Sequence, residues 1–382
     1  MSVHYQKVIK HYIYKIINRI VSLFPIKNHR VFFISFYGKT YSDNPKAISE
    51  ALYDKYGGKY DYVWAIDSKK GIPFYIKTCK YGTIKMMYYM STSKVWVSNF
   101  CLPKGTYKKK SQFYIQTWHG DKAFKKILHD VPSRDGFDKW LFETDKADLM
   151  VAGSEYGERQ YRTAFLYKGD VLKCGTPRND LFFKDTTELQ KKIRKEFDCN
   201  ENDRIVMYAP TFRRNNRDGI LELNFDYRKA IKILEETTGD SWKIMVRTHS
   251  ADHRKLIGVD GRRCIDVSDY PNINELLLIT DILITDFSSI AGDFALTNRH
   301  ILLYLYDSEN YYSKDRELYF DIENSPFFQT TKEKGVYDYL ESIGRIDANK
   351  NCSDILSFYG NYESGNTSQV IAEIIDSQSN ID

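Results

Sequence analysis

The sequence predicts two α/β domains in succession, each built on a parallel β-sheet, and three observations lead to this prediction. The chain has 382 residues, which is longer than one average domain and favours two. From Val31 onward, short apolar runs rich in β-branched and aromatic residues alternate with segments of helical pattern, as in βαβ units. A charged helical segment at residues 187–198 interrupts this alternation, which then starts again.

The strands of both domains are predicted from these apolar runs. The first domain is expected over residues 28–190 and contains VFFISF, DYVWAI, KVWVSNF, QFYIQTW, ADLMVAG and DVLKCG. The second is expected over residues 191–382 and contains RIVMYAP, WKIMVRT, DILIT and HILLYLY. A helix near residues 367–375 completes the second domain or packs back on the first. Doubly wound sheets bind ligands at the carboxyl ends of their strands, so we expect the two domains to face a central cleft.

Composition indicates a globular protein with a mildly basic charge. Hydrophobic residues make up 42% of the chain and charged residues 28%, proportions that argue against extensive disorder. The formal net charge of +5 suits an anionic partner such as a nucleotide, a polyol phosphate or a lipid surface, and it is too small to indicate nucleic acid. The six cysteines form no CxxC pair and follow no secretory signal, so we expect free thiols in a reducing cytosol.

Residues 1–27 are predicted to form a basic amphipathic helix that associates with a membrane. Apolar residues recur there at spacings of three and four, with cations largely between them: Val8, Ile9, Ile13, Ile16, Ile17, Ile20 and Phe24 against Lys7, Lys10, Lys15 and Arg19. Such a helix can lie in the headgroup layer of an anionic membrane. The alternative is a helix packed on its own domain. No apolar run approaches the roughly 20 residues that a membrane-spanning helix needs.

The first candidate for chemistry is a histidine in the run QTWHGDKAFKKI. We expect a strand to end at Thr117, and His119 and Gly120 to form the turn into a helix that carries the cations Lys122, Lys125 and Lys126. Gly120 and Lys122 are candidates for the acceptor side of the expected cleft. An imidazole with a pKa of about 6.5 can accept the proton of a hydroxyl group at cytosolic pH. The alternative is a structural histidine that caps the helix or is hydrogen-bonded within the fold.

Three loops after strands of the second domain carry groups that suit a phosphate. RTHS presents Arg247 and His249, which can donate hydrogen bonds to phosphoryl oxygens. In DFSS, the start of a helix offers free backbone amides and two hydroxyl groups. The third loop, YAPTFR, follows the first apolar run of the second domain. The candidates in these two loops are Asp286, Ser288, Ser289, Thr211 and Arg213. Ordinary helix capping and solvated surface loops are the structural alternatives.

A further loop, GTPRND, ends the first domain with Arg178, Asn179 and Asp180, which are candidates for the acceptor side of the expected cleft or for a structural turn. The patterns GxxxxGK[ST], GxGxxG, HExxH and GxSxG are absent, as is a DxD-type motif. Nothing has convincing metal-ligand spacing. We therefore expect no tightly bound cofactor and assign no metal site, and a metal requirement stays open.

Taken together and in this order, QTWHG, GTPRND, YAPTFR, RTHS and INELLLITDILITDFSS with DFAL resemble the bacterial CDP-glycerol glycerophosphotransferase family of teichoic-acid synthesis. GKTYSDNPKAI and YLYDSENYYSKDRELYFD resemble it too, so that the resemblance covers residues 31–325. It implies a GT-B-like fold of two Rossmann-type domains and a peripheral place at the cytoplasmic face of the cell membrane. The implied reaction transfers glycerol phosphate from CDP-glycerol to a hydroxyl group of a lipid-linked or polymer acceptor, with release of CMP, in teichoic-acid or capsule synthesis.

The resemblance also implies roles for individual residues. His119 and His249 match two histidines essential for activity in the family, and Ser288 and Ser289 match contacts to the donor pyrophosphate at a helix start. The chain departs from the family at DKAFKKI, where many relatives have TPLKKIG, and at Glu317, where glycine is common. CDP-ribitol therefore remains open as the donor. A GT-B glycosyltransferase that uses a nucleotide sugar also fits the expected fold, as does a non-catalytic protein that binds a nucleotide or a lipid.

Overall fold

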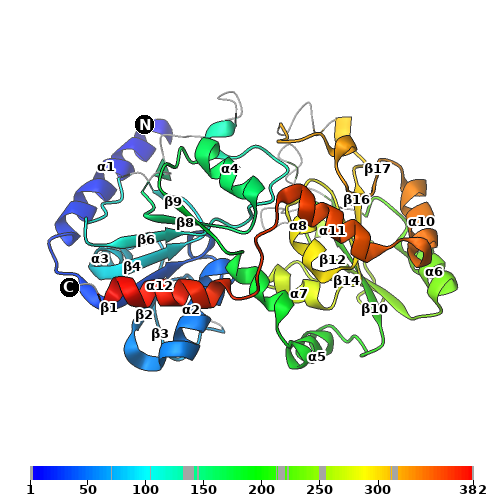
Figure 1. Cartoon of the computed structure of the whole chain (residues 1–382), viewed down its shortest axis with the longest axis horizontal. Helices are drawn as coiled ribbons and strands as arrows, with labels where there is room; N and C mark the ends of the chain where they lie inside the picture. Colours follow the sequence, from blue (N-terminus) through cyan, green and yellow to red (C-terminus); the bar gives the residue numbers. More distant parts are fainter. Residues whose placement is uncertain are drawn as a thin grey trace. The chain divides into compact units, whose positions relative to one another are not determined.

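The computed structural model describes residues 3–69, 71–103, 105–131, 142–143, 146–211, 213, 220–221, 223–248, 255–309, 311 and 317–380. The chain divides into two compact units, each with its own parallel sheet (Figure 1). Unit 1 comprises Met1–Asp121, Leu128–Phe183 and Tyr362–Asp382. Unit 2 comprises Lys122–Ile127 and Lys184–Asn361. The predicted fold class of two parallel-sheet α/β domains is confirmed.

The sheet of unit 1 has seven strands in the order β3-β2-β1-β4-β6-β8-β9, and every pairing is parallel. Along the chain the strands are β1 (Lys27–Ile34), β2 (Asp61–Ala65), β3 (Ile76–Cys79), β4 (Ser93–Ser98), β6 (Phe113–Gln116), β8 (Leu149–Ala152) and β9 (Asp170–Lys173). β1 is apolar throughout its second half because Val31 and Phe33 enter the core on one face while Phe32 and Ile34 enter the core on the other. The strand order reverses between β1 and β4, which makes this the topological switch point of unit 1.

The helices of unit 1 cover this sheet. They are α1 (Val3–Val21), α2 (Asp43–Tyr56), α3 (Ile84–Thr92), α4 (Glu155–Ala164) and α12 (Thr367–Ser379), with 3-10 turns η1 (Phe36–Gly38), η2 (Gly57–Lys59), η3 (Leu128–Asp130) and η6 (Pro177–Phe183). α2 and α12 pack side by side and contribute to one core, whereas α3 contributes Met86 and Met90 to the other (Figure 1). A short antiparallel pair, β5 (Leu102–Pro103) with β7 (Phe142–Glu143), lies outside the sheet.

The sheet of unit 2 has six parallel strands in the order β14-β12-β10-β15-β16-β17. Their bounds are β10 (Arg204–Ala209), β12 (Trp242–Val246), β14 (Cys264–Asp266), β15 (Ile282–Thr285), β16 (His300–Tyr304) and β17 (Gln329–Thr330). A separate parallel pair joins β11 (Ile220–Leu221) to β13 (Lys255–Leu256). The order reverses between β10 and β15, so each unit has one switch point at which a doubly wound sheet binds ligands.

The helices of unit 2 are α5 (Thr187–Glu196), α6 (Tyr227–Thr238), α7 (Ile273–Leu278), α8 (Ile290–Phe294), α10 (Glu333–Ser342) and α11 (Ala348–Tyr359), with 3-10 turns η7 (Ala295–Thr297), η8 (Ile322–Asn324) and η9 (Ile343–Arg345). Local sequence sets the limits of α6 and α11. Asp226 and Asp347 accept hydrogen bonds from free amides of the first turn, and left-handed Gly239 and Gly360 end the helices.

The division of the chain differs from the predicted one in three respects. The main segment of unit 2 begins at Lys184, residues 122–127 also belong to unit 2, and the C-terminal helix α12 belongs to unit 1 and not to the second domain. Ile371 and Ile375 of α12 are fully buried in the core of unit 1. The Asp180 carboxylate accepts hydrogen bonds from the amides of Thr367 and Ser368, at 3.0 and 2.7 Å, which caps the helix. Burial and capping together fix the end of the described chain on unit 1.

The prediction of a helix directly after His119 and Gly120 is wrong. Residues Lys122–Ile127 form no helix, and they belong to unit 2. Lys125 forms an antiparallel bridge with Leu318, and the buried ring of Phe124 packs against Phe320 and Phe327. Backbone pairing with a segment almost 200 residues away and burial of one aromatic ring override the helical spacing of the lysines.

The N-terminal helix is present as α1, and one of its faces packs on unit 1. α1 lies against α3, Asn18 and Val21 are buried, and the hydroxyl groups of Tyr14 and Thr106 are 2.9 Å apart. A second face carries Ile16 and Ile20, which are 59% and 57% exposed, together with Ile13. α1 is therefore a packed helix that also leaves an apolar stripe uncovered by described residues. No helix in the described part of the chain is long and apolar enough to cross a bilayer.

Replacing Asp180 with alanine is expected to loosen α12. The substitution leaves two buried amides without an acceptor and should cost about 2 kcal/mol. Amide hydrogen exchange of residues 367–379 should then accelerate by roughly 30-fold if α12 opens independently of the rest of the unit. Asp347→Ala, which removes an exposed cap from α11, is the matched control and should leave exchange in α12 unchanged. Unaltered protection of α12 in Asp180→Ala would contradict the capping role.

Candidate functional site

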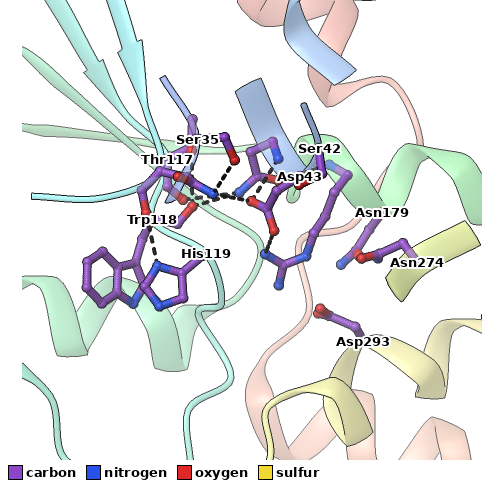
Figure 2. Close-up of polar contacts among 12 residues, drawn as sticks. Ser35, Ser42, Asp43, Thr117, Trp118, His119, Asn179, Asn274 and Asp293 are labelled. Carbon is purple, nitrogen blue, oxygen red and sulfur yellow. Dashed lines mark hydrogen bonds and ion pairs between the residues drawn. The ribbon is translucent and has the colours of Figure 1, made fainter. Parts of the chain in front are cut away.

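The candidate site of unit 1 lies at its switch point, where Ser35 follows β1 and Asn99 follows β4. The Asn99 side chain joins the two loops: its Oδ1 accepts a hydrogen bond from the Phe36 amide at 3.0 Å, and its Nδ2 donates to Ser35 Oγ at 3.3 Å. Figure 2 shows Ser35, Asp43 and His119 within this cluster of polar contacts. The polar groups that follow neighbouring strands are thus gathered at one edge of the sheet.

His119 is held in one tautomer by the backbone. Its Nδ1 lies 3.0 Å from the carbonyl oxygen of Asn99, and a carbonyl can only accept, so Nδ1 carries the hydrogen (Figure 2). In the neutral ring, Nε2 then holds the lone pair. Burial lowers the pKa of His119 below its usual value, the hydrogen bond to Asn99 and the charge of Asp43 oppose this effect, and Arg178 reinforces it. His119 is therefore a neutral imidazole at cytosolic pH, with Nε2 able to accept a proton.

Aromatic rings and strained backbone surround this histidine. The Phe100 ring stacks on the imidazole with centroids 4.9 Å apart and planes 7° apart, and Trp118 and Phe36 also contact it. Phe36, Asp43 and Trp118 have positive φ values of 44°, 63° and 51°. Left-handed backbone at a residue other than glycine costs about 1 to 3 kcal/mol and clusters at functional sites. The residues around His119 therefore fix the position of its ring, while their strained backbone lowers the local stability.

A buried carboxylate stands beside this cluster. Asp43 Oδ1 accepts hydrogen bonds from the Asn44 amide at 2.8 Å and from Asn99 Nδ2 at 3.0 Å. Asp43 Oδ2 lies 3.0 Å from Arg178 Nη1, and both side chains are less than 10% exposed. Sequence reasoning missed Asp43 and Asn99 as site residues. The run GKTYSDNPKAI contains Asp43 and resembles the family, but an Asp at a helix start has an ordinary reading as part of a cap.

The three candidates of the GTPRND loop have different surroundings. Arg178 pairs with Asp43 and so belongs to the site. Asn179 is buried and donates a hydrogen bond to Glu363 at 2.8 Å, while Asp180 caps α12. Asn179 and Asp180 therefore tie the loop to the C-terminal segment. These contacts hold the loop, and with it Arg178, in place. They do not indicate the predicted acceptor role for Asn179 and Asp180.

The chain passes from unit 1 to unit 2 between Asp121 and Lys122. Gly120 is buried between His119 and Asp121, which accepts hydrogen bonds from the amide of Gly153 and the hydroxyl of Ser154. Lys122 is fully buried in unit 2, and its ammonium group is 3.5 Å from the Asp293 carboxylate. The predicted contact of Lys122 with an acceptor does not fit this burial.

The switch point of unit 2 holds a second buried aspartate, Asp286, which follows β15. It accepts hydrogen bonds from the Thr211 amide at 2.9 Å and from Arg213 Nη2 at 2.8 Å. Arg213 also binds both oxygens of Asp307 at 2.7 Å and donates twice to Thr211. A guanidinium has five N–H donors, and these contacts use all of them. Burial lowers the pKa of Arg213, but its bonds to Asp307 and the charge of Asp286 raise it overall.

Arg213, Thr211 and Asp286 therefore close three loops on one another, and Arg213 has no N–H left for a phosphate in this arrangement. Arg247, after β12, differs. Its Nη1 donates to the carbonyl oxygens of Val267 and Tyr270 at 3.2 and 2.6 Å, and no described carboxylate pairs with it. Burial alone lowers its pKa to about 10. A largely desolvated cation without an acidic partner among the described residues is suited to bind an anion.

The remaining candidates of unit 2 are two serines and a histidine. Ser288 and Ser289 are partly exposed between β15 and α8, and the Ser289 side chain makes no capping hydrogen bond. His249 lies outside the described residues. Within the described ranges, no three His, Cys, Asp or Glu side chains come together in a group that could hold a metal ion.

Comparison with known proteins shows the family. A family model described as CDP-Glycerol:Poly(glycerophosphate) glycerophosphotransferase matches residues 16–377. The teichoic acid poly(glycerol phosphate) polymerase of Bacillus spizizenii is 32% identical, with 94% of this chain and 95% of the relative covered. The teichoic acid glycerol-phosphate transferase of Staphylococcus aureus is 31% identical, with 97% of this chain and 98% of the relative covered.

A solved structure of the wall teichoic acid polymerase TagF, a histidine-to-asparagine variant soaked with CDPG, is similar over almost the whole chain. It is 26% identical with a TM-score of 0.82, and the match covers 99% of this chain and 98% of that chain. The predicted GT-B-like fold is confirmed by this likeness and by the two Rossmann-type sheets. The chain belongs to the CDP-glycerol:poly(glycerophosphate) glycerophosphotransferase family.

Proposed function

We propose that this protein transfers glycerol phosphate from CDP-glycerol to a hydroxyl group of a polyol-phosphate or lipid-linked acceptor in teichoic-acid synthesis, with release of CMP. The observation that carries the proposal is the position of His119 at the switch point of unit 1, with Nδ1 3.0 Å from the Asn99 carbonyl oxygen, which leaves Nε2 as the proton acceptor. Membership of the family and the names of its polymerases and transferases support the donor and the product class.

In the proposed reaction, the acceptor oxygen attacks the phosphorus that bears glycerol. Nε2 of His119 takes the hydroxyl proton, a new phosphodiester bond forms, and the bond from that phosphorus to the bridging oxygen breaks. The electron pair leaves with CMP. Phosphoryl transfer depends mainly on positioning and on charge stabilisation, so the mechanism needs one base and a set of donors toward the diphosphate.

We assign the donor diphosphate to unit 2. Arg247 supplies a guanidinium with no described acidic partner, and Ser288 and Ser289 supply hydroxyl groups beside the switch point between β10 and β15. His249 is a further candidate by its resemblance to an essential histidine of the family. Arg213 is left out because its five donors are already used within the unit. No tightly bound cofactor is needed in this scheme.

His119→Ala is expected to lower turnover by about 10² to 10⁴ because a positioned general base contributes that much to the rate. Its affinity for CDP-glycerol, measured by calorimetry without acceptor, should change little. Arg247→Ala should instead weaken donor binding by about tenfold or more, the loss expected for a charge-assisted hydrogen bond. CMP release with CDP-glycerol and with CDP-ribitol, each with a lipid-linked saccharide or polymer acceptor, measures turnover and identifies the donor.

Arg204→Ala is the matched control for the loss of charge in unit 2. Arg204 lies at the amino end of β10, is 52% exposed in its side chain and pairs with Asp281. Its loss should leave donor affinity intact. Turnover of His119→Ala close to that of the wild type would rule out the proposed base, and unchanged donor affinity in Arg247→Ala would remove Arg247 from the donor site.

We further propose that α1 holds the enzyme at an anionic membrane surface, where a lipid-linked acceptor would be found. The support is its stripe of Ile13, Ile16 and Ile20, each more than half exposed, beside exposed Lys15 and Arg19. Apolar side chains can enter the headgroup layer while the cations meet anionic lipids.

Replacing Ile16 and Ile20 with serine should weaken binding to anionic liposomes by at least about tenfold, since burying an isoleucine side chain is worth about 1.5 to 3 kcal/mol. Co-sedimentation measures this, and binding by the wild type should fall at high salt because exposed charges are screened. Phe74→Ser with Leu166→Ser, which removes two other exposed apolar side chains of unit 1, is the control. Equal co-sedimentation of all three proteins would reject the proposal.

A further inference from the structure

We propose that Asp43, Asn99 and Arg178 are positioning residues for His119: a buried, hydrogen-bonded relay that fixes the tautomer of the imidazole and its readiness to accept a proton. None of the three is assigned a part in proton transfer itself. The inference rests on the proposed function of His119 as the base, and it is tested below by a measurement that needs no turnover.

The relay begins at the carbonyl oxygen of Asn99, which accepts the Nδ1 hydrogen of His119 at 3.0 Å. The direction of this carbonyl depends on the Asn99 side chain, which is fully buried and bonded to the Phe36 amide, Ser35 Oγ and Asp43 Oδ1. A side chain with three hydrogen bonds to two segments cannot turn without breaking several of these bonds. Asn99 thereby fixes both the loop and the acceptor for His119.

The relay ends in the pair of Asp43 and Arg178, 3.0 Å apart and nearly excluded from water. The side chain of Asn44 fixes the backbone on both sides of this pair. Its Oδ1 accepts a hydrogen bond from the Arg178 amide at 3.0 Å, and its Nδ2 donates to the Trp118 carbonyl oxygen at 2.9 Å. The bonds of Asn44 thus connect the pair to the residue before His119. Geometry alone therefore links the charged pair to the imidazole by two routes, one through Asn99 and one through Asn44.

The two charges act on His119 in opposite directions. Burial lowers the pKa of His119, the Asp43 carboxylate raises it, and the Arg178 guanidinium lowers it; these are the charged groups of the described chain that act on the ring. Asp43→Asn removes the raising charge and leaves the lowering one. The pKa of His119 should fall, so the acid limb of the rate profile should move to lower pH. Adding Arg178→Gln to that variant removes the lowering charge, and the pKa should rise again.

The experiment records NMR spectra of the protein labelled with 15N-histidine. The resonances of His119 are those that disappear in His119→Asn. In the wild type, neutral His119 should be protonated at Nδ1. The pKa should fall by roughly 0.5 to 1 pH unit in Asp43→Asn and recover part of that shift in Asp43→Asn with Arg178→Gln. A wild-type ring protonated at Nε2, or equal pKa values in the wild type and both variants, would overturn the inference.

Asp61→Asn is the matched control. It breaks another buried pair of unit 1, that of Asp61 with Arg30, whose side chains are 8% and 6% exposed. A comparable loss of stability without a shift of the His119 pKa is expected, which separates a charge effect from general loosening. If Asp43→Asn does not fold, the wild-type tautomer alone decides.

Turnover of His119→Ala separates this inference from the proposed function. Activity retained in His119→Ala, with the expected resonance shifts present, would remove His119 as the base while leaving the relay in place. If His119→Ala is inactive but the wild-type ring shows neither the expected tautomer nor the expected pKa shifts in the variants, His119 stays as the proposed base and the relay is rejected.

Discussion

A buried carboxylate must be met by hydrogen-bond donors, and this requirement organises the candidate site of unit 1. Asp43 is less than 10% exposed, is paired with Arg178 and lies where the sheet reverses its strand order. An isolated carboxylate would not stay charged there, because desolvation costs several kcal/mol that only good partners offset. Its donors come from the start of α2, from the loop after β4 and from the loop after β9. The charge of one residue thus gathers three segments around His119.

Unit 2 meets the same constraint with a different set of residues. Asp286 follows β15 at the second switch point, and its partner Arg213 follows β10. In both units an aspartate and an arginine form an ion pair at the switch point of the sheet, so these arginines have a structural role. The groups left for chemistry are those without a described carboxylate partner, His119 in unit 1 and Arg247 in unit 2.

The sequence was sufficient where structure depends on local pattern. Strands such as β4 and β15 are buried on both faces, and their continuous apolar runs were identified from the sequence. His119 and Arg247 were identified as candidates because polar residues after such runs lie at the carboxyl edge of a sheet. The missed features depend on partners far away in the chain. Asp180 is 187 residues from the helix that it caps, and the stretch around Phe124 forms no helix because it pairs with residues near Leu318. Spacing along the chain carries no signal for either.

The pKa of His119 reflects a compromise that explains why a charged pair lies beside the proposed base. Burial among Phe36, Phe100 and Trp118 holds the ring in place and keeps it neutral at cytosolic pH, but a base whose pKa falls far below the operating pH accepts a proton poorly. A lone carboxylate would correct this and would itself be unstable when buried. Pairing with Arg178 stabilises the buried carboxylate and cancels part of its effect on the pKa of His119. The ring therefore keeps its apolar setting while retaining more basicity than burial alone would leave.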